Sequence, residues 1–359
     1  MRDAIVFSFG TWETFNVPER ISLALAALGC RVLHCETPVS MLRGARQPLR
    51  EVGPGIHAAR FGFISSRLAQ VPGGAQFQAR MLERQIESAA SALGLRDAMF
   101  LYAPLDCLFP LCARMKRRRF TVHICMDHSV MDDPDYDRYV ALADRTLAIP
   151  EISYHKFYAR YGSKVVPIPQ SGNVREVAGE DCLGLPEPPA LAGIPRPRLG
   201  FWGPVSSRVN RPLIAALLQT HPEWHFLYAD AGYPLLPHPN AHALPWEPPQ
   251  QVAASLQALD VGFMPYDCHD ESALHCVPLK LFDYFAFGLP VVSTPVIHLW
   301  AHRDLVYLGD SAAELEAAVL AALREPPDSP KRSARMEIAR RHSLRNLAAV
   351  LRECLPLAA

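Results

Sequence analysis

Residues 278–292, PLKLFDYFAFGLPVV, place one lysine and one aspartate in an otherwise apolar run. The apolar residues recur at helical spacing, and Lys280 and Asp283 stand three residues apart on a neighbouring face. Gly288 suits a helix C-cap and Pro290 prevents the helix from continuing, so the following VVST reads as a strand. The stretch therefore predicts a helix that turns tightly into a buried strand, which is the repeating unit of an α/β fold.

The first half of the chain repeats this alternation of apolar runs and helical patterns. Strands are predicted over AIVFSFG, RVLHCE, AMFLYAP, FTVHICMD, RTLAIP and KVVPIPQ, and helices over ERISLALAALG, DCLFPLCARMKR, YDRYVALAD and ISYHKFYARYG. Such alternation indicates a parallel sheet with crossover helices. Residues 40–80, rich in Gly, Arg and Gln, are less regular, and we expect them to form loops over one edge of the sheet.

A second α/β alternation starts near residue 198. Strands are predicted over LGFWG, WHFLYAD, AHALPW, DVGFMPY, PVVSTP and LVYLG, and helices over PLIAALLQTHP, PQQVAASLQAL and SAAELEAAVLAALRE. Residues 171–197 are rich in proline, glycine and small residues, as in a linker. We predict domains at 1–170 and 198–340 joined by that linker, with a terminal helix in 341–359 that packs back on the first domain.

The bulk composition indicates a globular protein. The 359 residues carry 36 basic and 36 acidic side chains, so the chain has no general attraction to nucleic acid. No apolar run is long enough to span a bilayer, and MRDAIVFSFG reads as a strand rather than a signal peptide. Nine scattered cysteines without a CxxC suggest reduced thiols. We therefore expect a cytoplasmic location.

Two parallel sheets predict where a ligand would lie. In open parallel sheets, ligands collect at the carboxyl ends of the strands, where helix N-termini favour anions. A phosphate-bearing ligand between the two domains is therefore expected. The fold alone does not fix a reaction.

Five segments, in this order, are similar to GT-B glycosyltransferases, in particular to the retaining family-4-like group that uses nucleotide-sugar donors. They are FSFGTWETFNVPERISLALAALGCRVLHCE, HICMDHSVMDDPDY, LGFWGPVSSRVNRPLIAALLQTHPEWHFLYAD, NAHALPWEPPQQVAASLQALDVGFMPY and PLKLFDYFAFGLPVVSTP. The resemblance implies a GT-B fold, in which two Rossmann-like parallel-sheet domains face a central cleft. It also implies transfer of a hexosyl unit from a UDP- or GDP-sugar.

The resemblance implies a donor site in the second domain. Lys280 matches the lysine at the donor diphosphate, where an ammonium stabilises the charge of the leaving group, and the next residue, Leu281, is also expected to bind the donor. Asp283 matches an acidic position, usually Glu, that holds the ribose; a surface ion pair between Lys280 and Asp283 is the alternative. Arg208 matches the second basic residue that contacts the diphosphate, although the nearby Arg211 could take this role. The alternative is that Arg208 is a solvated loop arginine.

Two further features of the predicted donor site are less regular. Gly203 would let the backbone approach the donor, although a simple turn glycine is nearly as well supported. His275 stands where the family often has an acid that contacts the donor sugar, which puts the identity of the sugar in doubt. Asp270 or Glu271 could supply the missing carboxylate. The Cys, His and acidic residues of 268–276 have no familiar zinc spacing, so no metal is expected.

The first domain carries the predicted acceptor site. Asp127 and His128 follow a strand; one would be the general base of an inverting enzyme, and in a retaining enzyme they would orient sugar or acceptor. A loop Asp capping a helix is the alternative. Gly10 lies in the first strand-to-helix turn near donor phosphate or acceptor. Trp12 and Glu13 are expected to shape the acceptor pocket, although a core or rim Trp is equally well supported.

One dense basic run, RMKRRRF at 114–120, suggests a further partner. Lys116, Arg117, Arg118 and Arg119 could contact the cytoplasmic face of the inner membrane, although a solvated helix end is the favoured interpretation.

We predict a metal-independent glycosyltransferase of polysaccharide biosynthesis without a cofactor, since the nucleotide sugar is a substrate. Its acceptor would be a glycan, a lipid-linked sugar or a small molecule. A UDP-sugar 2-epimerase-like isomerase is one alternative, because such enzymes share the two-domain plan. A catalytically silent nucleotide-sugar-binding protein is the other, and it is suggested by His275 and Asp283.

Overall fold

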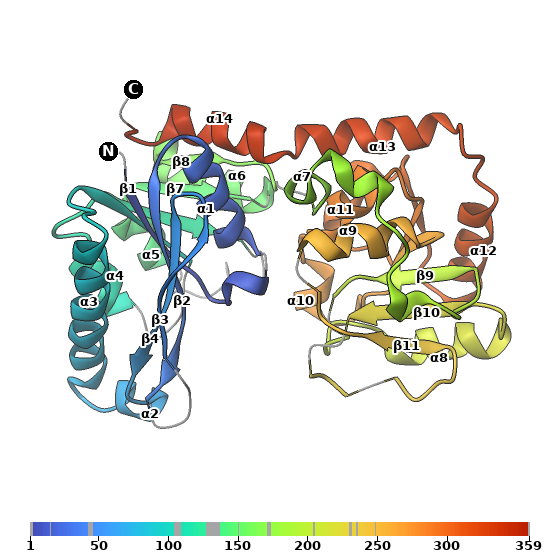
Figure 1. The fold of residues 1–359 in the computed structure, drawn as a ribbon, viewed down its shortest axis with the longest axis horizontal. Coiled ribbons are helices and arrows are strands. Elements are labelled where there is room, and N and C mark those ends of the chain that lie inside the picture. The colour runs from blue at the N-terminus through green and yellow to red at the C-terminus, as the bar shows by residue number, and fades with distance from the viewer. Residues whose placement is uncertain are drawn as a thin grey trace. The chain divides into compact units, whose positions relative to one another are not determined.

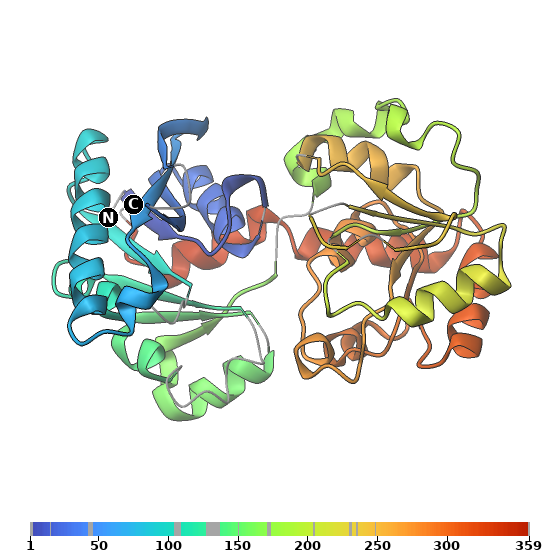
Figure 2. The same ribbon diagram turned by 90° about the horizontal axis from the view of Figure 1, so that it is seen from below.

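A computed structural model describes most of the chain. The described residues are 3–14, 16–41, 46–103, 109–126, 137–149, 151–170, 174–203, 205–229, 232–234, 236–247 and 249–357. The chain divides into two compact units: unit 1 is Met1–Gln170 with Leu344–Ala359, and unit 2 is Ser171–Ser343. Each unit contains one sheet flanked by helices (Figures 1 and 2). The predicted α/β class with two parallel-sheet domains is confirmed.

Unit 1 is built on an eight-stranded sheet of order β3-β4-β2-β1-β5-β6-β7-β8. Its strands are β1 (Asp3–Phe7), β2 (Arg31–Ser40), β3 (Gln47–Gly53), β4 (Ile56–Phe63), β5 (Ala98–Tyr102), β6 (Thr121–Cys125), β7 (Arg145–Ala148) and β8 (Val165–Pro167). Neighbouring strands run parallel except for the hairpin of β3 and β4.

Helices cover both faces of this sheet (Figure 1). They are α1 (Val17–Ala27), α2 (Ser66–Ala69), α3 (Gly74–Ala92), α4 (Phe109–Met115), α5 (Asp137–Leu142), α6 (Glu151–Tyr161) and α14 (Leu344–Cys354). Alternate residues of β1 point to opposite faces, as the pleat requires. Ile5 and Phe7 pack in the core that includes α3 and α4, whereas Ala4 and Val6 pack in the core that includes α1 and α14. The C-terminal helix thus contributes to the core of unit 1.

Residues 40–80 differ from the sequence-based expectation, which is wrong for most of this segment. Instead of loops they contain the β3–β4 hairpin, α2 and the start of α3. Their hydrophobic alternation is weak because β3 is an edge strand: most of its residues stay partly or fully exposed. An edge strand with polar side chains on both faces lacks the period-two signal that identifies a half-buried strand.

Unit 2 is built on a six-stranded, all-parallel sheet of order β11-β10-β9-β12-β13-β14. Its strands are β9 (Arg198–Phe201), β10 (His225–Ala229), β11 (Ala241–Leu244), β12 (Val261–Met264), β13 (Val291–Ser293) and β14 (Val306–Leu308). The strand order reverses direction between β9 and β12. In doubly wound sheets a crevice forms at that switch point, outside the carboxyl ends of the strands.

The described helices of unit 2 are α7 (Val174–Ala178), α8 (Arg211–Thr220), α9 (Pro249–Gln257), α10 (Glu271–Leu274), α11 (Lys280–Ala286), α12 (Ala312–Leu323) and α13 (Pro330–Arg341). They include three that the sequence did not predict, the short α7 and α10 and the longer α13. Helix α13 was missed because its sequence is polar; the buried Arg335 fastens it by donating to the carbonyls of Leu305 and Gly288 and pairing with Glu325.

The segment 171–197, predicted to be a linker, lies within unit 2. It carries α7 and the 3-10 helices η5 (Glu180–Gly184) and η6 (Pro189–Leu191), and α7 contacts α9 and α11. Its prolines and glycines therefore shape short packed turns rather than a free connection.

Residues 278–292 fold as predicted. Helix α11 ends at Ala286, Gly288 adopts a left-handed φ of 68°, and β13 begins at Val291. A glycine is favoured there because L-residues with a side chain rarely adopt a positive φ.

The basic run of 114–120 is largely neutralised by ion pairs within unit 1. Lys116 pairs with Asp144, and Arg119 donates to both carboxylate oxygens of Glu87 at 3.1 and 2.7 Å. Arg117 and Arg118 remain exposed. None of the helices in the described part of the chain is long and apolar enough to cross a membrane.

Buried imidazoles should make the fold sensitive to acid. Burial lowers the pKa of His123 to about 3 and the pKa of His298 and His302 to about 4. Because the unfolded chain binds protons near pH 6.5 and the folded chain does not, the free energy of unfolding should fall as the pH drops below 6.5. Each histidine contributes up to about 1.4 kcal/mol per pH unit.

Urea unfolding at several pH values between neutral and mildly acidic measures this effect. The variant His123→Phe keeps an aromatic ring between Tyr102 and Tyr139 and should lose less stability on acidification than the wild type. A free energy of unfolding that stays constant over this range would contradict the burial of neutral imidazoles.

Candidate functional site

The candidate site lies at the switch point of unit 2, where β9 and β12 end. Helix α11 is fixed there by Tyr284, whose hydroxyl donates to Gly200 O at 2.9 Å and accepts from Trp202 N–H at 2.8 Å. Tyr284 is fully buried. Because these bonds join α11 to β9 and to the residue that follows it, they hold the first turn of α11, with Lys280, beside the end of the strand.

Lys280 lies between aromatic side chains. Its Nζ donates to the Tyr266 hydroxyl at 3.0 Å and lies 4.3 Å from the centre of the Phe201 ring. Burial, followed by the charge of Arg208, lowers the pKa of Lys280 to about 8, although Cys276 and Asp283 act in the opposite direction. A partly desolvated ammonium of this kind is stabilised when an anion approaches it.

Gly203 lies directly against Lys280. A Cβ atom at Gly203 would come within 3.2 Å of Lys280 Cε and 3.5 Å of Nζ. Any side chain would therefore crowd the ammonium. The predicted close approach of the backbone at Gly203 to a donor stays a prediction.

Arg208 brings a second cation to the same crevice. It lies in the loop between β9 and α8, and its Nε donates to Ser272 Oγ at 3.1 Å. Its carbonyl accepts from Asp267 N–H at 2.9 Å, which joins this loop to the segment after β12. Arg208 is close enough to Lys280 to lower the lysine pKa. Arg208 and Lys280 are 72 residues apart in the sequence, yet the charge of Arg208 acts on the ammonium of Lys280.

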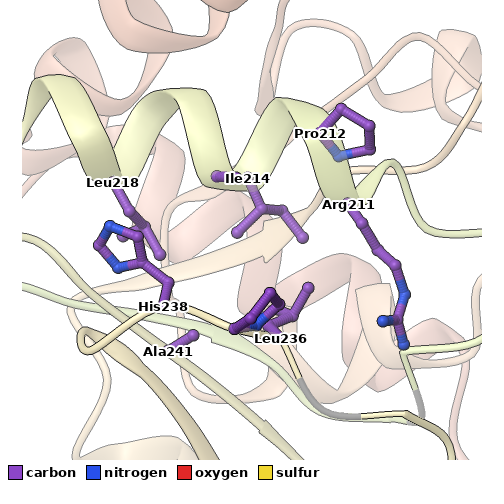
Figure 3. A pocket seen from close by; sticks show the side chains of 9 residues that line it. Arg211, Pro212, Ile214, Leu218, Leu236, His238 and Ala241 are labelled. Carbon is purple, nitrogen blue, oxygen red and sulfur yellow. The ribbon is translucent and has the colours of Figure 1, made fainter.

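Arg211, the sequence-based competitor of Arg208, has a different environment. Its guanidinium donates to the carbonyls of Val205, at 2.9 Å, and Pro234. It lines a cavity of about 230 Å³ between α8 and residues 236–241 (Figure 3). The described lining of that cavity is otherwise apolar except for His238 and includes neither Arg208 nor Lys280. Arg208 is therefore the better partner for Lys280.

The predicted sugar-contacting residues lie on and around α10. Asp270 caps this helix by accepting from Ser272 N–H at 2.8 Å, and hydrogen bonds from Ser272 lower the Asp270 pKa. Ser272 also binds Arg208, so Asp270, Ser272 and Arg208 form a connected polar chain. Glu271 is exposed and His275 is partly buried at the end of α10. Among the described residues no three Cys, His or acidic side chains gather as a metal site requires.

Asp283 and Leu281 belong to the packed side of α11. Asp283 is 8% exposed, and its Oδ1 accepts from Val174 N–H at 2.8 Å, which fastens the start of α7. Its predicted contact with a ribose stays a prediction. The prediction for Leu281 is wrong: the residue is 0% exposed and its N–H is bonded to Pro278 O, so it has no surface to offer a ligand.

In unit 1, Gly10 and Trp12 lie in the loop between β1 and α1. A Cβ atom at Gly10 would lie 2.4 Å from Thr14 Oγ1, which explains a glycine at this tight turn. Trp12 begins η1 (Trp12–Thr14), and its N–H donates to Glu36 Oε1 at 2.9 Å. Its ring and the His34 ring form an edge-to-face contact with their centres 5.1 Å apart. The loop is thus anchored to β2, and Trp12 remains partly exposed.

Sequence reasoning missed the polar cluster behind this loop. Glu36 is fully buried and pairs with Arg50 at 2.7 Å and Arg60 at 3.3 Å. Although burial opposes it, hydrogen bonding from Arg50 keeps the pKa of Glu36 below its usual value. Arg50 also reaches Glu13 at 3.4 Å. The sequence feature that could have revealed this cluster is Glu36, an acidic residue at the carboxyl end of the predicted strand RVLHCE.

A second buried network supports the same loop. Ser8 Oγ donates to Glu19 Oε1 at 2.6 Å and lies 3.1 Å from Gly10 N, from which it accepts a hydrogen bond. His34 contacts Glu19 at 2.9 Å and Ser22 at 2.9 Å, and the side chains of this network are fully buried. The Ser–His–Glu arrangement is sealed from solvent and therefore supports the loop rather than acting as a nucleophile.

Two predicted catalytic residues, Asp127 and His128, lie outside the described residues. His123, two positions before the end of β6, is a neutral core imidazole packed between Tyr102 and Tyr139.

Comparisons with known proteins agree on a GT-B fold. No family model matches the chain. A segment of 104 residues is 31% identical to a Bacillus subtilis (strain 168) protein described as a putative teichuronic acid biosynthesis glycosyltransferase, TuaH. This match covers 27% of the chain and 26% of the relative, so the chain matches about a quarter of that protein.

Solved structures match over the full length. The E. coli trehalose-6-phosphate protein bound with UDP-2-fluoro glucose is 12% identical over 99% of both chains, with a TM-score of 0.65. A Burkholderia multivorans trehalose 6-phosphate synthase is 13% identical, covering 99% of this chain and 98% of that one, with a TM-score of 0.67. The Burkholderia xenovorans synthase in complex with glucose-6-phosphate is 11% identical over 99% and 100%, with a TM-score of 0.66. The GT-B fold predicted from the sequence is confirmed.

The environment of Lys280 predicts an unusual titration. The chain has five lysines, so acetic anhydride labelling followed by mass spectrometry can follow each one. The reactivity of Lys280 toward acetic anhydride should rise with pH, with a midpoint near pH 8. The exposed Lys156 serves as the internal reference. Tyr266→Phe should lower the midpoint further, because an acceptor of the ammonium is lost. A midpoint above 10 for Lys280 would contradict the packing described here.

Proposed function

We propose that the protein is a glycosyltransferase that moves a hexosyl unit from a UDP- or GDP-sugar to a glycan, lipid-linked or small-molecule acceptor with retention of configuration. One observation carries the proposal: a partly desolvated lysine and an arginine converge at the switch point of unit 2. A diphosphate is the ligand that such a pair of cations fits best at this place in a doubly wound sheet.

In this proposal the charges of the leaving diphosphate are neutralised by the protein. Lys280 binds the phosphate nearest the sugar, and Arg208, oriented by Ser272, binds the other. Because cations already placed in a dry site need no reorganisation during the reaction, they stabilise the charge that develops on the leaving group. No divalent ion is required by this arrangement, and Asp283 holds the ribose.

The acceptor belongs to unit 1 in this proposal. Trp12 is partly exposed, its N–H donates to Glu36 and its ring contacts His34; Glu13 is exposed and pairs with Arg50. A flat aromatic surface flanked by charged groups suits the apolar face and hydroxyls of a sugar. Asp127 and His128 follow β6 in the sequence and would orient the acceptor or the transferred sugar.

The comparisons support the reaction class. The curated relative is described as a glycosyltransferase. One of the similar structures is bound with UDP-2-fluoro glucose, and another concerns enzymatic glycosyltransfer with retention by trehalose-6-phosphate synthase. These ligands and reactions belong to those proteins, and here they motivate the choice of a nucleotide sugar and of retention.

Removing the ammonium should weaken donor binding and transfer. Lys280→Ala loses a charge-assisted hydrogen bond of roughly 1.5–3 kcal/mol, which corresponds to a roughly ten- to hundredfold loss in the rate of UDP or GDP release from a nucleotide sugar. The assay contains EDTA, since the proposed site needs no metal. Product analysis with donor alone distinguishes transfer or hydrolysis from epimerisation.

A matched control is available for this variant. Lys331 also lies over an aromatic ring, with its Nζ 4.5 Å from the centre of Tyr307, but it belongs to α13. Lys331→Ala should leave the reaction rate within about twofold of the wild type. Equal losses in both variants, or unchanged turnover in Lys280→Ala, would refute the assignment of the donor site.

The pH dependence of nucleotide binding gives an independent check. Because the pKa of Lys280 is lowered to about 8, its charged form is lost as the pH rises through 8, and diphosphate affinity should fall between pH 7 and 9. Bound diphosphate should raise this pKa, so binding near pH 8 should be accompanied by proton uptake. Calorimetry in buffers of different ionisation enthalpy measures that uptake, and binding of UDP or GDP that is constant across this range would contradict the proposal.

A further inference from the structure

One end of unit 1 has a surface that the proposed reaction does not use. We call it the unit 1 tip: the end of β2, the start of β3, the end of β4, α2 and the first turns of α3 (Figure 1). Hydrogen bonds hold these parts together. Met41 N–H donates to Phe63 O at 2.7 Å, and Gln78 Oε1 accepts from the N–H groups of Ile64 and Ser65 at 3.1 Å each. The tip lies at the carboxyl ends of β2 and β4.

The tip exposes apolar side chains. Met41 is 44% exposed, and Val71 and Phe77 are each 54% exposed. Single exposed apolar residues need no explanation, but these three all belong to the connected segments of the tip. Their exposure indicates a surface that contacts something less polar than water.

The same segment is strongly basic within a chain of zero net charge. Between residues 37 and 86 the sequence contains two glutamates, Glu51 and Glu83, and seven arginines, Arg43, Arg46, Arg50, Arg60, Arg67, Arg80 and Arg84. Arg50 and Arg60 bind Glu36, and Glu83 binds Arg114. Arg46, Arg67, Arg80 and Arg84 are exposed, and none of them pairs with a carboxylate among the described residues.

Helix α3 arranges part of this charge beside an apolar side chain. Phe77, Arg80 and Arg84 occupy positions i, i+3 and i+7 and therefore form one stripe on the helix surface. All three are exposed, whereas Leu82 and Ile86 on the opposite side are buried. Arg46 adds charge near Met41, since both side chains lie within 3 Å of where a Cβ of Gly62 would stand.

We propose that the unit 1 tip is a docking surface for a bilayer that contains anionic lipid. Phe77, Val71 and Met41 enter the boundary between headgroups and acyl chains, and the four unpaired arginines bind lipid phosphates. Apolar insertion combined with attraction to anionic headgroups is how peripheral proteins bind membranes without spanning them. The site differs from the basic run of 114–120, most of whose cations are neutralised within unit 1.

Two other occupants fit the surface less well. A soluble polyanion would engage the arginines but would gain little from half-exposed Phe77 and Val71. A second copy of the chain, packed symmetrically through the tip, would bring like-charged arginines together. A bilayer with anionic headgroups satisfies both the charge and the apolar side chains.

Co-sedimentation of the full chain with vesicles tests the proposal. Vesicles of phosphatidylcholine alone are compared with vesicles containing about one-third phosphatidylglycerol, at salt concentrations of about 0.1 M and about 0.5 M. The wild type should bind the anionic vesicles and release them at the higher salt. Arg80→Glu with Arg84→Glu should lower the partition coefficient roughly tenfold or more. Val71→Ser with Phe77→Ser should lower it by a similar factor.

Matched controls come from exposed residues elsewhere in unit 1. Arg117→Glu with Arg118→Glu makes the same charge change on the other basic run, and Ile152→Ser with Tyr158→Ser removes apolar side chains that are 45% and 46% exposed on α6. Both control pairs should change the partition coefficient by less than about twofold. Far-UV circular dichroism and thermal unfolding of every variant report that the chain is folded.

Several outcomes would overturn the proposal. One is equal binding to neutral and anionic vesicles, and another is an equal loss in tip and control variants. Retention of the wild type by immobilised heparin without vesicle binding would assign the tip to a soluble polyanion. A dimer that dissociates in Val71→Ser with Phe77→Ser, without vesicle binding, would assign it to a second copy. The vesicle assay needs no nucleotide sugar, so these outcomes are independent of the proposed glycosyl transfer.

Discussion

The partial desolvation of the Lys280 ammonium is the constraint on which the candidate site depends. One hydroxyl and two aromatic rings, those of Phe201 and Tyr266, face this charge, and they offset only part of the free energy lost when water is removed. The site therefore favours a ligand that brings negative charge. The packing that enforces this is rigid: Tyr284 ties α11 to β9, and Gly203 leaves only the space that the lysine fills. A cation held in this way is already oriented before a ligand arrives.

Unit 1 also contains a buried charged side chain, and in this unit the charge is negative. Glu36 is a buried carboxylate, and it is tolerated because two arginines and the Trp12 N–H surround it. Breaking any of these contacts would leave a buried charge without compensation. The loop that carries Gly10 and Trp12 is therefore held by the hydrogen bond from Trp12 N–H to Glu36 and by the Ser8–Glu19 hydrogen bond. Both units place buried polar groups at the carboxyl ends of their strands, where parallel α/β folds bind ligands.

Sequence periodicity predicted most strands and helices because parallel strands are buried on both faces and their crossover helices are amphipathic. It failed for elements whose formation depends on tertiary packing rather than on a local hydrophobic pattern. Edge strand β3 is only partly buried and its apolar residues Leu49 and Val52 do not alternate, and α13 is polar and held by the buried guanidinium of Arg335. The segment 171–197 was predicted to be a linker because it is rich in proline, glycine and small residues, yet α7 and η5 of this segment pack on α9. The role of Leu281 was misjudged because helical position alone does not show which face meets solvent.

The sequence by itself determined two α/β units, the tight turn from α11 into β13, and Lys280, Arg208 and Gly203 as candidates for one site. These follow from local chemistry: helix periodicity, the conformational freedom of Gly288, and residue types matched to a resembling family. Only the tertiary structure decided that Arg208 rather than Arg211 shares the surroundings of Lys280, and that Glu36 pairs with Arg50 and Arg60. It also decided that most of the cations at 114–120 are neutralised, whereas Arg46, Arg67, Arg80 and Arg84 have no carboxylate partner among the described residues. The physical reason is that pairing and desolvation depend on distances between segments far apart in the chain, which no local pattern encodes.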